Sequence, residues 1–247
     1  MNIPIDTHTH STASGHAYST IDELAKAARE RGLAGFVLTD HGPALGGCTH
    51  KYHFGNLKTI PRIIFDVRFY SGIEGNILDT RGNTDIPGEY AGALDFIMAG
   101  FHELCFEPKG EKENTEAMIA AIANPVVDAI SHPGNGIFPV SIDAVVDAAK
   151  EYGKVMEINN ASFRVRPGSK VNCRQFARKC VDRGVLMSCS TDAHYRTDLG
   201  IFTESLAVFE ETGVLPEMVI NSSVERFEAY IEKRKAERTE ALKGMKS

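Results

Sequence analysis

The stretch AGFVLTDH, residues 34–41, contains the pattern from which the fold can be predicted. A short run of apolar residues is followed at once by the polar residues Thr39, Asp40 and His41. Continuous apolar runs of this length are typical of strands that are buried on both faces, as in a parallel sheet. The polar residues then fall at the carboxyl end of such a strand.

Similar apolar runs recur along the chain, and helical segments lie between them. The predicted strands are Ile3–Ile5, Ala34–Leu38, Phe69–Ile73, Leu94–Ala99, Val126–Ile130, Lys154–Ile158 and Val185–Cys189. The predicted helices are Ile21–Arg31 (behind a capping box of Thr20 and Glu23), Asn56–Val67, Asn114–Ala123, Ser141–Tyr152, Val171–Arg183 and Glu204–Glu211. This alternation predicts an α/β fold, a closed or nearly closed barrel of parallel strands.

The composition is that of a globular protein and excludes several classes. Of the 247 residues, 43% are hydrophobic and 24% are charged, which is ample for a buried core. A formal net charge of −6 argues against a protein that binds the phosphate backbone of nucleic acids. The sequence contains neither an apolar run of about 18 residues nor a secretory signal, so we expect a cytoplasmic protein without a membrane segment.

Three further expectations concern the cysteines, the domain organisation and the chain's surface. The 5 cysteines, an odd number without a CxxC pair, are interpreted as reduced thiols. We expect one barrel domain over residues 1–247, with a charged C-terminal helix and tail from about residue 223. The glycine-rich stretch Gly42–Gly55 is expected to be a surface loop.

Histidines gather where the predicted strands end. Because the carboxyl ends of parallel strands share one face of a barrel, residues from distant parts of the chain are expected to converge there. Glu74 and Asp192 follow strands in the same way, whereas His50 and His53 fall outside the pattern and are interpreted as loop or lid residues. The histidines of the pattern are His8, His10, His16, His41, His102, His132 and His194.

A metal centre explains this collection better than separate structural roles do. A lone histidine after a strand is more often a loop residue or a helix cap than a ligand. A cluster of imidazoles is unfavourable without a cation, because each protonation disfavours the next, and a divalent metal removes that conflict. Seven histidines and two carboxylates exceed the ligand number of one ion, so the sequence predicts two or three ions.

The residues together resemble the PHP (polymerase and histidinol phosphatase) family of metal-dependent phosphoesterases. Stretches at residues 16–20 (HAYST), 130–135 (ISHPGN) and 157–163 (EINNASF) are similar to the stand-alone YcdX-type phosphatases of that family. The matching order, from Asp6 to His194, is His8-x-His10, His16, Thr39-Asp40-His41, Glu74, Gly100-Phe101-His102, Ser131-His132-Pro133 and Asp192-Ala193-His194.

The resemblance implies a distorted (β/α)7 TIM-like barrel that holds three divalent metal ions, zinc first, with manganese or iron as alternatives. It gives catalytic roles to Glu74, Asp192 and His194, while Asp6 and Asp40 are interpreted as groups that orient the HxH pair and His41. By position, the implied ligand sets are His8, His10, Glu74 and Asp192 for the first ion, Glu74, His102 and His132 for the second, and His16, His41 and His194 for the third.

Such a centre can hydrolyse small-molecule phosphate monoesters. A pair of ions bridged by a carboxylate can hold a hydroxide at neutral pH, and a third ion can bind a phosphate oxygen. Arg164, Arg166 and Lys170 either contact the substrate phosphate or are solvated surface charges, and the sequence leaves both roles open. The family resemblance also leads us to expect a homo-oligomer, for instance a trimer.

Three other functions stay open at this stage. Amidohydrolase barrels also begin with HxH, but no lysine follows the fourth predicted strand here, and His16 and His194 would be surplus. A PHP-type exonuclease that acts on DNA is the second alternative, although the chain lacks a basic stripe interleaved with aromatic residues. The third is a metal-binding scaffold, which would hold ions without hydrolysing anything.

Overall fold

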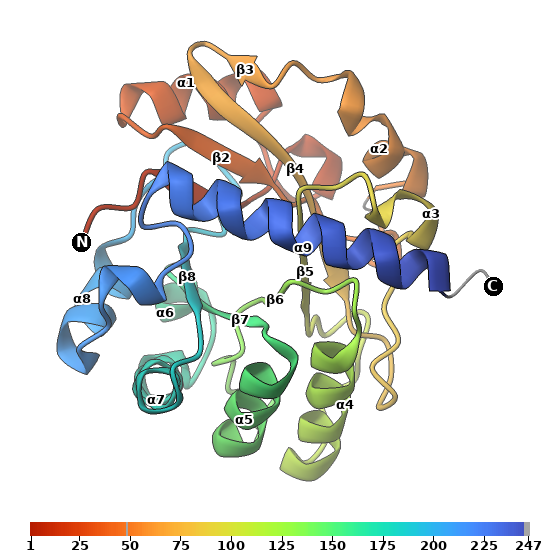
Figure 1. The fold of residues 1–247 in the computed structure, drawn as a ribbon, viewed down its shortest axis with the longest axis vertical. Helices are drawn as coiled ribbons and strands as arrows, with labels where there is room; N and C mark the ends of the chain where they lie inside the picture. Colours follow the sequence, from red (N-terminus) through yellow and green to blue (C-terminus); the bar gives the residue numbers. More distant parts are fainter. Residues whose placement is uncertain (48, 245–247) are drawn as a thin grey trace.

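Seven parallel strands form a barrel in the computed structural model, which describes residues 1–47 and 49–244 (Figure 1). The barrel closes where β1 and β8 meet, because the backbone N–H of His10 donates to the carbonyl of Ala193 at 3.0 Å. In sheet order the strands are β1 (Ile5–Thr9), β2 (Gly35–Leu38), β4 (Val67–Asn76), β5 (Phe96–Gly100), β6 (Ala129–Ile130), β7 (Val155–Asn159) and β8 (Met187–Ser190). The predicted distorted (β/α)7 barrel is confirmed.

Most predicted helices are present, and α1 begins where its capping box predicts. The side chain of Glu23 accepts from the backbone N–H of Thr20 at 2.8 Å, and Thr20 Oγ1 accepts from the N–H of Glu23 at 3.3 Å. The longer helices are α1 (Ile21–Glu30), α4 (Glu111–Ala123), α5 (Ile142–Tyr152), α7 (Ser169–Arg183), α8 (Thr203–Thr212) and α9 (Val224–Gly244). The shorter ones are η1 (Thr12–Ser14), α2 (Lys51–Asn56), η2 (Leu57–Thr59), α3 (Gly88–Ala91), α6 (Ser162–Val165) and η3 (Pro216–Met218).

The predicted helix over Asn56–Val67 is wrong. Only the short η2 lies there, and it is followed by β3 (Ile63–Ile64), which pairs antiparallel with β4. Pro61 disfavours a helical conformation for the residue before it. Phe65 and Asp66 both have positive φ angles, 50° and 65°, as a two-residue hairpin turn requires. The expected loop at Gly42–Gly55 is also partly helical, because α2 begins at Lys51.

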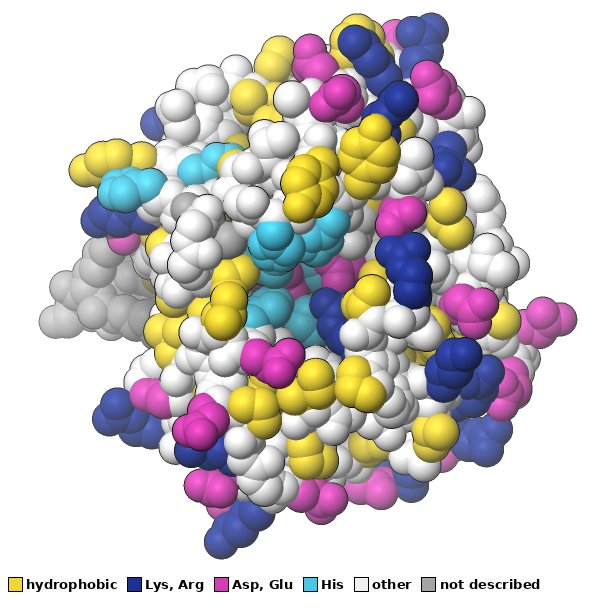
Figure 2. Space-filling view, turned by 180° about the vertical axis from the view of Figure 1, so that it is seen from behind, with side chains coloured by type: hydrophobic (Ala, Val, Ile, Leu, Met, Phe, Trp, Pro, Cys, Tyr) yellow, Lys and Arg dark blue, Asp and Glu magenta, His cyan; other side chains and the backbone are white. Residues whose placement is uncertain are grey.

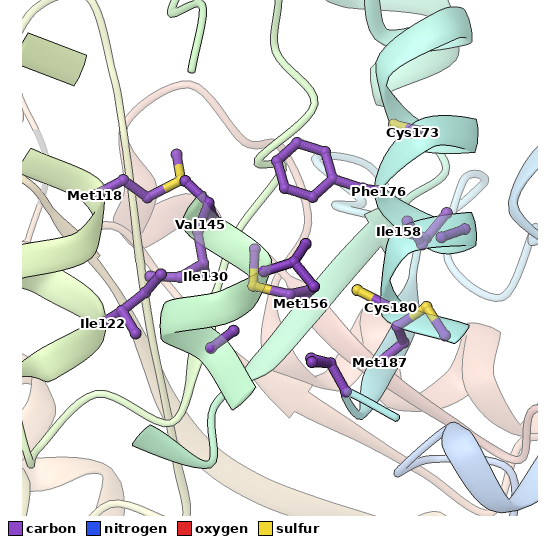
Figure 3. Close-up of a cluster of buried hydrophobic side chains, with 14 of the residues drawn as sticks. Met118, Ile122, Ile130, Val145, Met156, Ile158, Cys173, Phe176, Cys180 and Met187 are labelled. Carbon is purple, nitrogen blue, oxygen red and sulfur yellow. The ribbon is translucent and has the colours of Figure 1, made fainter. Parts of the chain in front are cut away.

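The core between the sheet and the helices explains the apolar runs of the sequence. Figure 3 shows side chains of α4, α5 and α7 packed against strands β6, β7 and β8. Met156 and Ile158 of β7 and Met187 of β8 are fully buried there, beneath Phe176 of α7 and Val145 of α5. Strand side chains on this outer face are apolar because they meet helices, not water.

Helix α9 crosses the end of the barrel at which the strands begin (Figure 1). Its Phe227 and Ile231 pack against Ile5, Phe96 and Val155, which are the first residues of their strands. This end of the barrel is therefore covered, and the opposite end, where the strands finish, is left for a site.

Two sequence expectations can be compared directly with the described part of the chain. Cys173, Cys180 and Cys189 are free, buried thiols, whereas Cys48 and the end of the tail, residues 245–247, lie outside the described residues. Within the described ranges, no helix has the length and apolar character needed to cross a bilayer.

Candidate metal centre

All nine predicted ligands meet at the carboxyl end of the barrel. His8 lies within β1 and Glu74 within β4, and the other seven follow the ends of their strands. Figure 2 shows histidine and acidic side chains gathered in a hollow in the middle of one face. The convergence expected from the parallel topology is therefore what the fold produces.

Glu74 is the centre of the cluster, because both of its carboxylate oxygens face imidazoles. Its Oε2 lies 3.1 Å from His8 Nε2, 3.0 Å from His41 Nδ1 and 3.5 Å from His10 Nε2. Its Oε1 lies 2.8 Å from His132 Nε2 and 3.3 Å from His102 Nε2. A fully buried carboxylate in this position can bridge two cations.

Asp192 forms the second centre and joins the remaining histidines to the cluster. Its Oδ1 lies 3.1 Å from His10 Nε2 and 3.4 Å from His194 Nδ1. His194 Nε2 in turn lies 3.0 Å from His16 Nε2, and the His16 and His41 rings stack at 5.0 Å. His16 and His194 are the solvent side of the cluster, since the other histidine side chains lie deeper.

Several ligand atoms lack a hydrogen-bond partner among the described residues although they are buried. Some of them lie close to another ligand atom, as Glu74 Oε2 does to His41 Nδ1 at 3.0 Å, but without the geometry of a hydrogen bond. Buried polar atoms without partners are costly, and in a native protein they call for an explanation such as a bound ion. These atoms are Glu74 Oε2, Asp192 Oδ1, His41 Nδ1, His132 Nδ1 and both ring nitrogens of His102.

Among the residues that the structure describes, three groups of side chains have ligand atoms that all lie within 4.8 Å of one another. These groups overlap, because His10, His41 and Glu74 each belong to two of them. Imidazole nitrogen and carboxylate oxygen are ligands that suit zinc, manganese and iron. The residues therefore fit a centre of several divalent ions. The groups are His8 with His10 and Glu74, His41 with Glu74 and His102, and His10 with His41 and His194.

The electrostatics of the cluster favour a cation among the carboxylates. Burial opposes protonation of His8, but Glu74, Glu157 and Asp192 outweigh it and hold the pKa of His8 well above its usual value. Burial, with His194 and His41 nearby, lowers the pKa of His10 far below its usual value. Burial and Arg166 together lower the pKa of His132 to about 4. The lowered pKa values of His10 and His132 favour their neutral form, which is the form of imidazole that binds metal.

The backbone is strained at two of the predicted ligands. His132 has a φ angle of 32° and Asp192 one of 55°, in the left-handed region that residues other than glycine rarely adopt. Gly100 lies close to this corner, since a Cβ there would come within 2.0 Å of Ser131 Oγ. Strain of this kind persists only where the surrounding structure enforces it, and it clusters at functional sites.

A layer of side chains behind the ligands holds the imidazoles in place, and sequence reasoning assigned it incompletely. Glu157, not identified as a site residue, accepts from His132 N at 2.5 Å and has Oε1 2.7 Å from His8 Nδ1. Ser14 Oγ lies 3.1 Å from His10 Nδ1 and donates to Asp40 at 2.7 Å. The available signal was a carboxylate inside an otherwise apolar strand, since Glu157 lies within β7.

The two aspartates expected to orient ligands do so differently than predicted. Asp40 supports His10 through Ser14 and lies 3.0 Å from His53 Nε2, so it does not orient the His41 ring directly. Asp6 accepts backbone N–H groups of His8 and Thr191, at 3.4 and 3.1 Å, and thereby joins β1 to the end of β8. Burial raises the pKa of Asp6 to about 6.

The predicted substrate cations lie in two different hollows. Arg166 lines the hollow above the cluster and donates to Asp192 Oδ2 at 2.8 Å. Arg164 is largely exposed, pairs with Asp198 at 2.8 Å and lines a neighbouring hollow of about 260 Å³ together with Lys170.

His50, which lies outside the predicted ligand pattern, caps α2, where its ring accepts from the N–H of Tyr52 at 3.2 Å.

Comparisons with known proteins agree with this description. Residues 6–161 match the PHP domain. A "probable phosphatase" of Acetivibrio thermocellus is 50% identical over 238 residues, 96% of this chain and 98% of that protein. A "probable phosphatase" of Thermoanaerobacter sp. is 46% identical and covers 95% of this chain and 97% of its own length.

A solved structure shares the fold at low sequence identity. It is histidinol phosphate phosphatase from Lactococcus lactis, complexed with zinc, L-histidinol and phosphate. It is 15% identical, with a TM-score of 0.65, and the match covers 86% of this chain and 95% of that one.

The fold and the cluster define a barrel of the metal-dependent hydrolase class. The chain belongs to the PHP domain family. The predicted enzyme class, a metal-dependent phosphatase, is confirmed by the family and by relatives that match along nearly the whole chain.

Proposed function

We propose that this protein hydrolyses phosphate monoesters of small molecules at a centre of three divalent ions. The observation that carries the proposal is the convergence of seven imidazoles on Glu74 and Asp192, with buried donor atoms left unpaired at their centre. A cluster this costly to bury is best explained by bound cations.

The three ligand sets implied by the family resemblance are retained in the proposal. The first set is supported because His8, His10 and Glu74 form one of the compact groups. The second is supported because Glu74 and His102 belong to another of these groups, which also includes His41. His16 is assigned to the third set because its Nε2 lies 3.0 Å from that of His194. Zinc is the first choice of metal, since the similar histidinol phosphate phosphatase was solved with it and imidazole is a preferred zinc ligand.

The chain's own residues then account for binding and orientation. Divalent ions held here would supply Lewis-acid activation of the phosphate and a water of lowered pKa. Arg166 is placed to donate to a phosphate oxygen, because it lines the hollow and its guanidinium already lies beside the cluster. Asn159, which donates to Asp192 Oδ2 at 3.2 Å, keeps that carboxylate turned towards the histidines.

The test combines metal analysis with a substrate screen. Purified protein is analysed for its elements and assayed on p-nitrophenyl phosphate, single-stranded DNA and amide substrates, before and after chelation and after addition of zinc, manganese or iron. We expect bound transition metal and turnover of the phosphate monoester that chelation removes and metal restores. Faster degradation of DNA than of the phosphate monoester would favour the exonuclease alternative. Hydrolysis of the amide substrates would favour the amidohydrolase alternative. Bound metal without turnover of any substrate would favour the metal-binding scaffold.

The third ion can be tested with a pair of matched variants. His16→Ala should lose phosphatase turnover and bind fewer metal equivalents while its circular dichroism is unchanged. His50→Ala is the control, since His50 caps α2 outside the cluster. This variant should keep the native turnover and the native number of metal equivalents. Unchanged turnover in His16→Ala would remove the third ion from the proposal.

Three further sequence predictions stay predictions. They are the organisation of residues 1–247 as one domain, assembly into a homo-oligomer such as a trimer, and location in the cytoplasm. Sedimentation of the purified protein would test the assembly.

A further inference from the structure

The hollow above the metal cluster is apolar on most of its walls. It encloses about 510 Å³, and its base contains His16, His41, His102 and Arg166. A volume of this size exceeds what a phosphate group needs, so it can also hold the rest of a substrate. The apolar side chains that line it are Leu45, Phe101, Leu104, Ile137, Phe138 and Val165.

The inner wall is rigid. Phe101 and Phe138 are buried and stack on one another with ring centroids 4.9 Å apart and an interplanar angle of 22°. Phe106 packs behind Phe101 at 4.6 Å. Aromatic side chains that are fixed by their neighbours form a surface that keeps its shape when a ligand binds.

Two side chains at the mouth are apolar although they are exposed to water. Leu104, in the segment after β5, is 81% exposed, and Val165, at the end of α6, is 58% exposed. Figure 2 shows hydrophobic side chains on the rim of the hollow that contains the histidines. A single exposed apolar residue is ordinary, but two that line the same cavity continue its apolar wall outward.

The charges of the cavity are arranged so that only its base favours an anion. Among the described residues that line it, Arg166 is the one lysine or arginine, and it lies at the base beside Asp192. Glu103, exposed near the mouth, is a carboxylate. A second anionic group on the substrate would therefore meet apolar walls and a like charge, both of which are unfavourable.

We propose that this cavity selects phosphate monoesters whose leaving group is apolar and carries no second anionic group, such as alkyl or aryl phosphates. This inference rests on the proposed function of the metal centre. The phosphate would occupy the base beside Arg166 and the histidines, and the leaving group would lie between the Phe101–Phe138 wall and the residues of the mouth. Nucleotides and carboxylated sugar phosphates are disfavoured by the same arrangement.

A homologous series of alkyl phosphates tests the proposal, because chain length changes apolar contact while the ester chemistry stays the same. With the metal-loaded protein, kcat/KM should be at least about tenfold higher for hexyl phosphate than for ethyl phosphate. It should be lower for 5-carboxypentyl phosphate, which has the same chain length and a terminal carboxylate. Binding of hexylphosphonate and ethylphosphonate, measured by calorimetry, should show the same preference without turnover.

Variants at the mouth connect this preference to the cavity. In the double variant Leu104→Ser and Val165→Ser, the ratio of kcat/KM for hexyl over ethyl phosphate should fall to within about threefold of one. The control carries Ile63→Ser and Leu215→Ser, two apolar residues that are also more than half exposed but do not line the cavity, and should keep the native ratio. Glu103→Gln should raise the relative rate for 5-carboxypentyl phosphate.

The outcomes separate the two proposals. Hydrolysis of every ester at equal kcat/KM, or a preference for the carboxylated ester, overturns this inference and leaves the proposed function intact. A metal-loaded chain that hydrolyses none of the esters overturns both. A length preference that the mouth variant and the control variant lose equally also overturns the inference, because the preference would not then depend on the cavity.

Discussion

The two ends of the barrel both bury charged side chains, but they differ in how fully the carboxylates are hydrogen-bonded. At the amino end, covered by α9, Arg234 donates to Asp128 at 3.0 Å, and Arg238, fully buried, bonds the other oxygen of Asp128 and the carbonyl of Leu94. At the carboxyl end, Glu74 Oε2 and Asp192 Oδ1 have no hydrogen-bond partner among the described residues.

The difference separates a structural use of charge from a functional one. Where arginine and aspartate neutralise one another, the protein supplies both partners and needs no ligand, although Nε of Arg238 has no hydrogen-bond partner in the described part of the chain. Where histidines surround two carboxylates, the charge balance depends on what binds. Stability should therefore depend mainly on the amino end, and activity on the carboxyl end.

The largest expected effect comes from removing the central carboxylate of the cluster. Glu74→Gln should reduce phosphatase turnover below detection and lower the number of metal equivalents, because five imidazoles lose their shared anionic partner. Its circular dichroism should match the native protein. Glu240→Gln, on an exposed part of α9, is the control. Native turnover in Glu74→Gln would show that Glu74 holds no essential ion.

A variant at the amino end should have the opposite consequence. Asp128→Ala leaves Arg234 and Arg238 without their anion and should lower the free energy of unfolding by about 3–5 kcal/mol. Metal equivalents per folded chain should not change. Urea unfolding measures the loss, and Asp147→Ala, which removes a solvent-exposed partner of Arg183, should cost less than about 1 kcal/mol. Equal losses in the two variants would contradict the comparison.

A smaller effect is expected from the layer behind the ligands. Glu157→Gln should weaken metal affinity by about 10- to 100-fold, because the charge that orients His8 and favours its binding to a cation is lost. Competition with a chelator measures the affinity, and Glu151→Gln, exposed at the end of α5, provides the control. Native affinity in Glu157→Gln would mean that His8 is held by packing alone.

The smallest expected effect is a pH dependence at the amino end. Burial, together with Arg234, lowers the pKa of Lys154 to about 8 in the folded state. The unfolded chain then binds more protons between pH 8 and about 10.5, so this group makes stability rise with pH across that interval. Between pH 8 and 10.5, the free energy of unfolding of the native protein should rise by on the order of 1 kcal/mol relative to that of Lys154→Met. A difference that stays constant with pH would contradict it.

Sequence reasoning succeeded where the signal was local. Each of the seven apolar runs overlaps a barrel strand, and the capping box at Thr20 marks the start of α1. It failed at Asn56–Val67, where a helix was predicted but Pro61 and the turn at Phe65 and Asp66 prevail. β1 also extends to Thr9, beyond the predicted Ile5. Its residues after Ile5 are polar, so the search for apolar runs missed them, although the structure buries them.

The order of strands and helices, and the side chains found where strands end, could be predicted from residue patterns because these features depend on neighbours along the chain. It also carried the family resemblance, since that rests on residue types in order. The folded structure was needed to show that Glu157 supports His8 from 149 residues away and that the hollow above the histidines has apolar walls. Contacts of that kind depend on how the barrel closes, and no local pattern encodes the direction of a buried side chain.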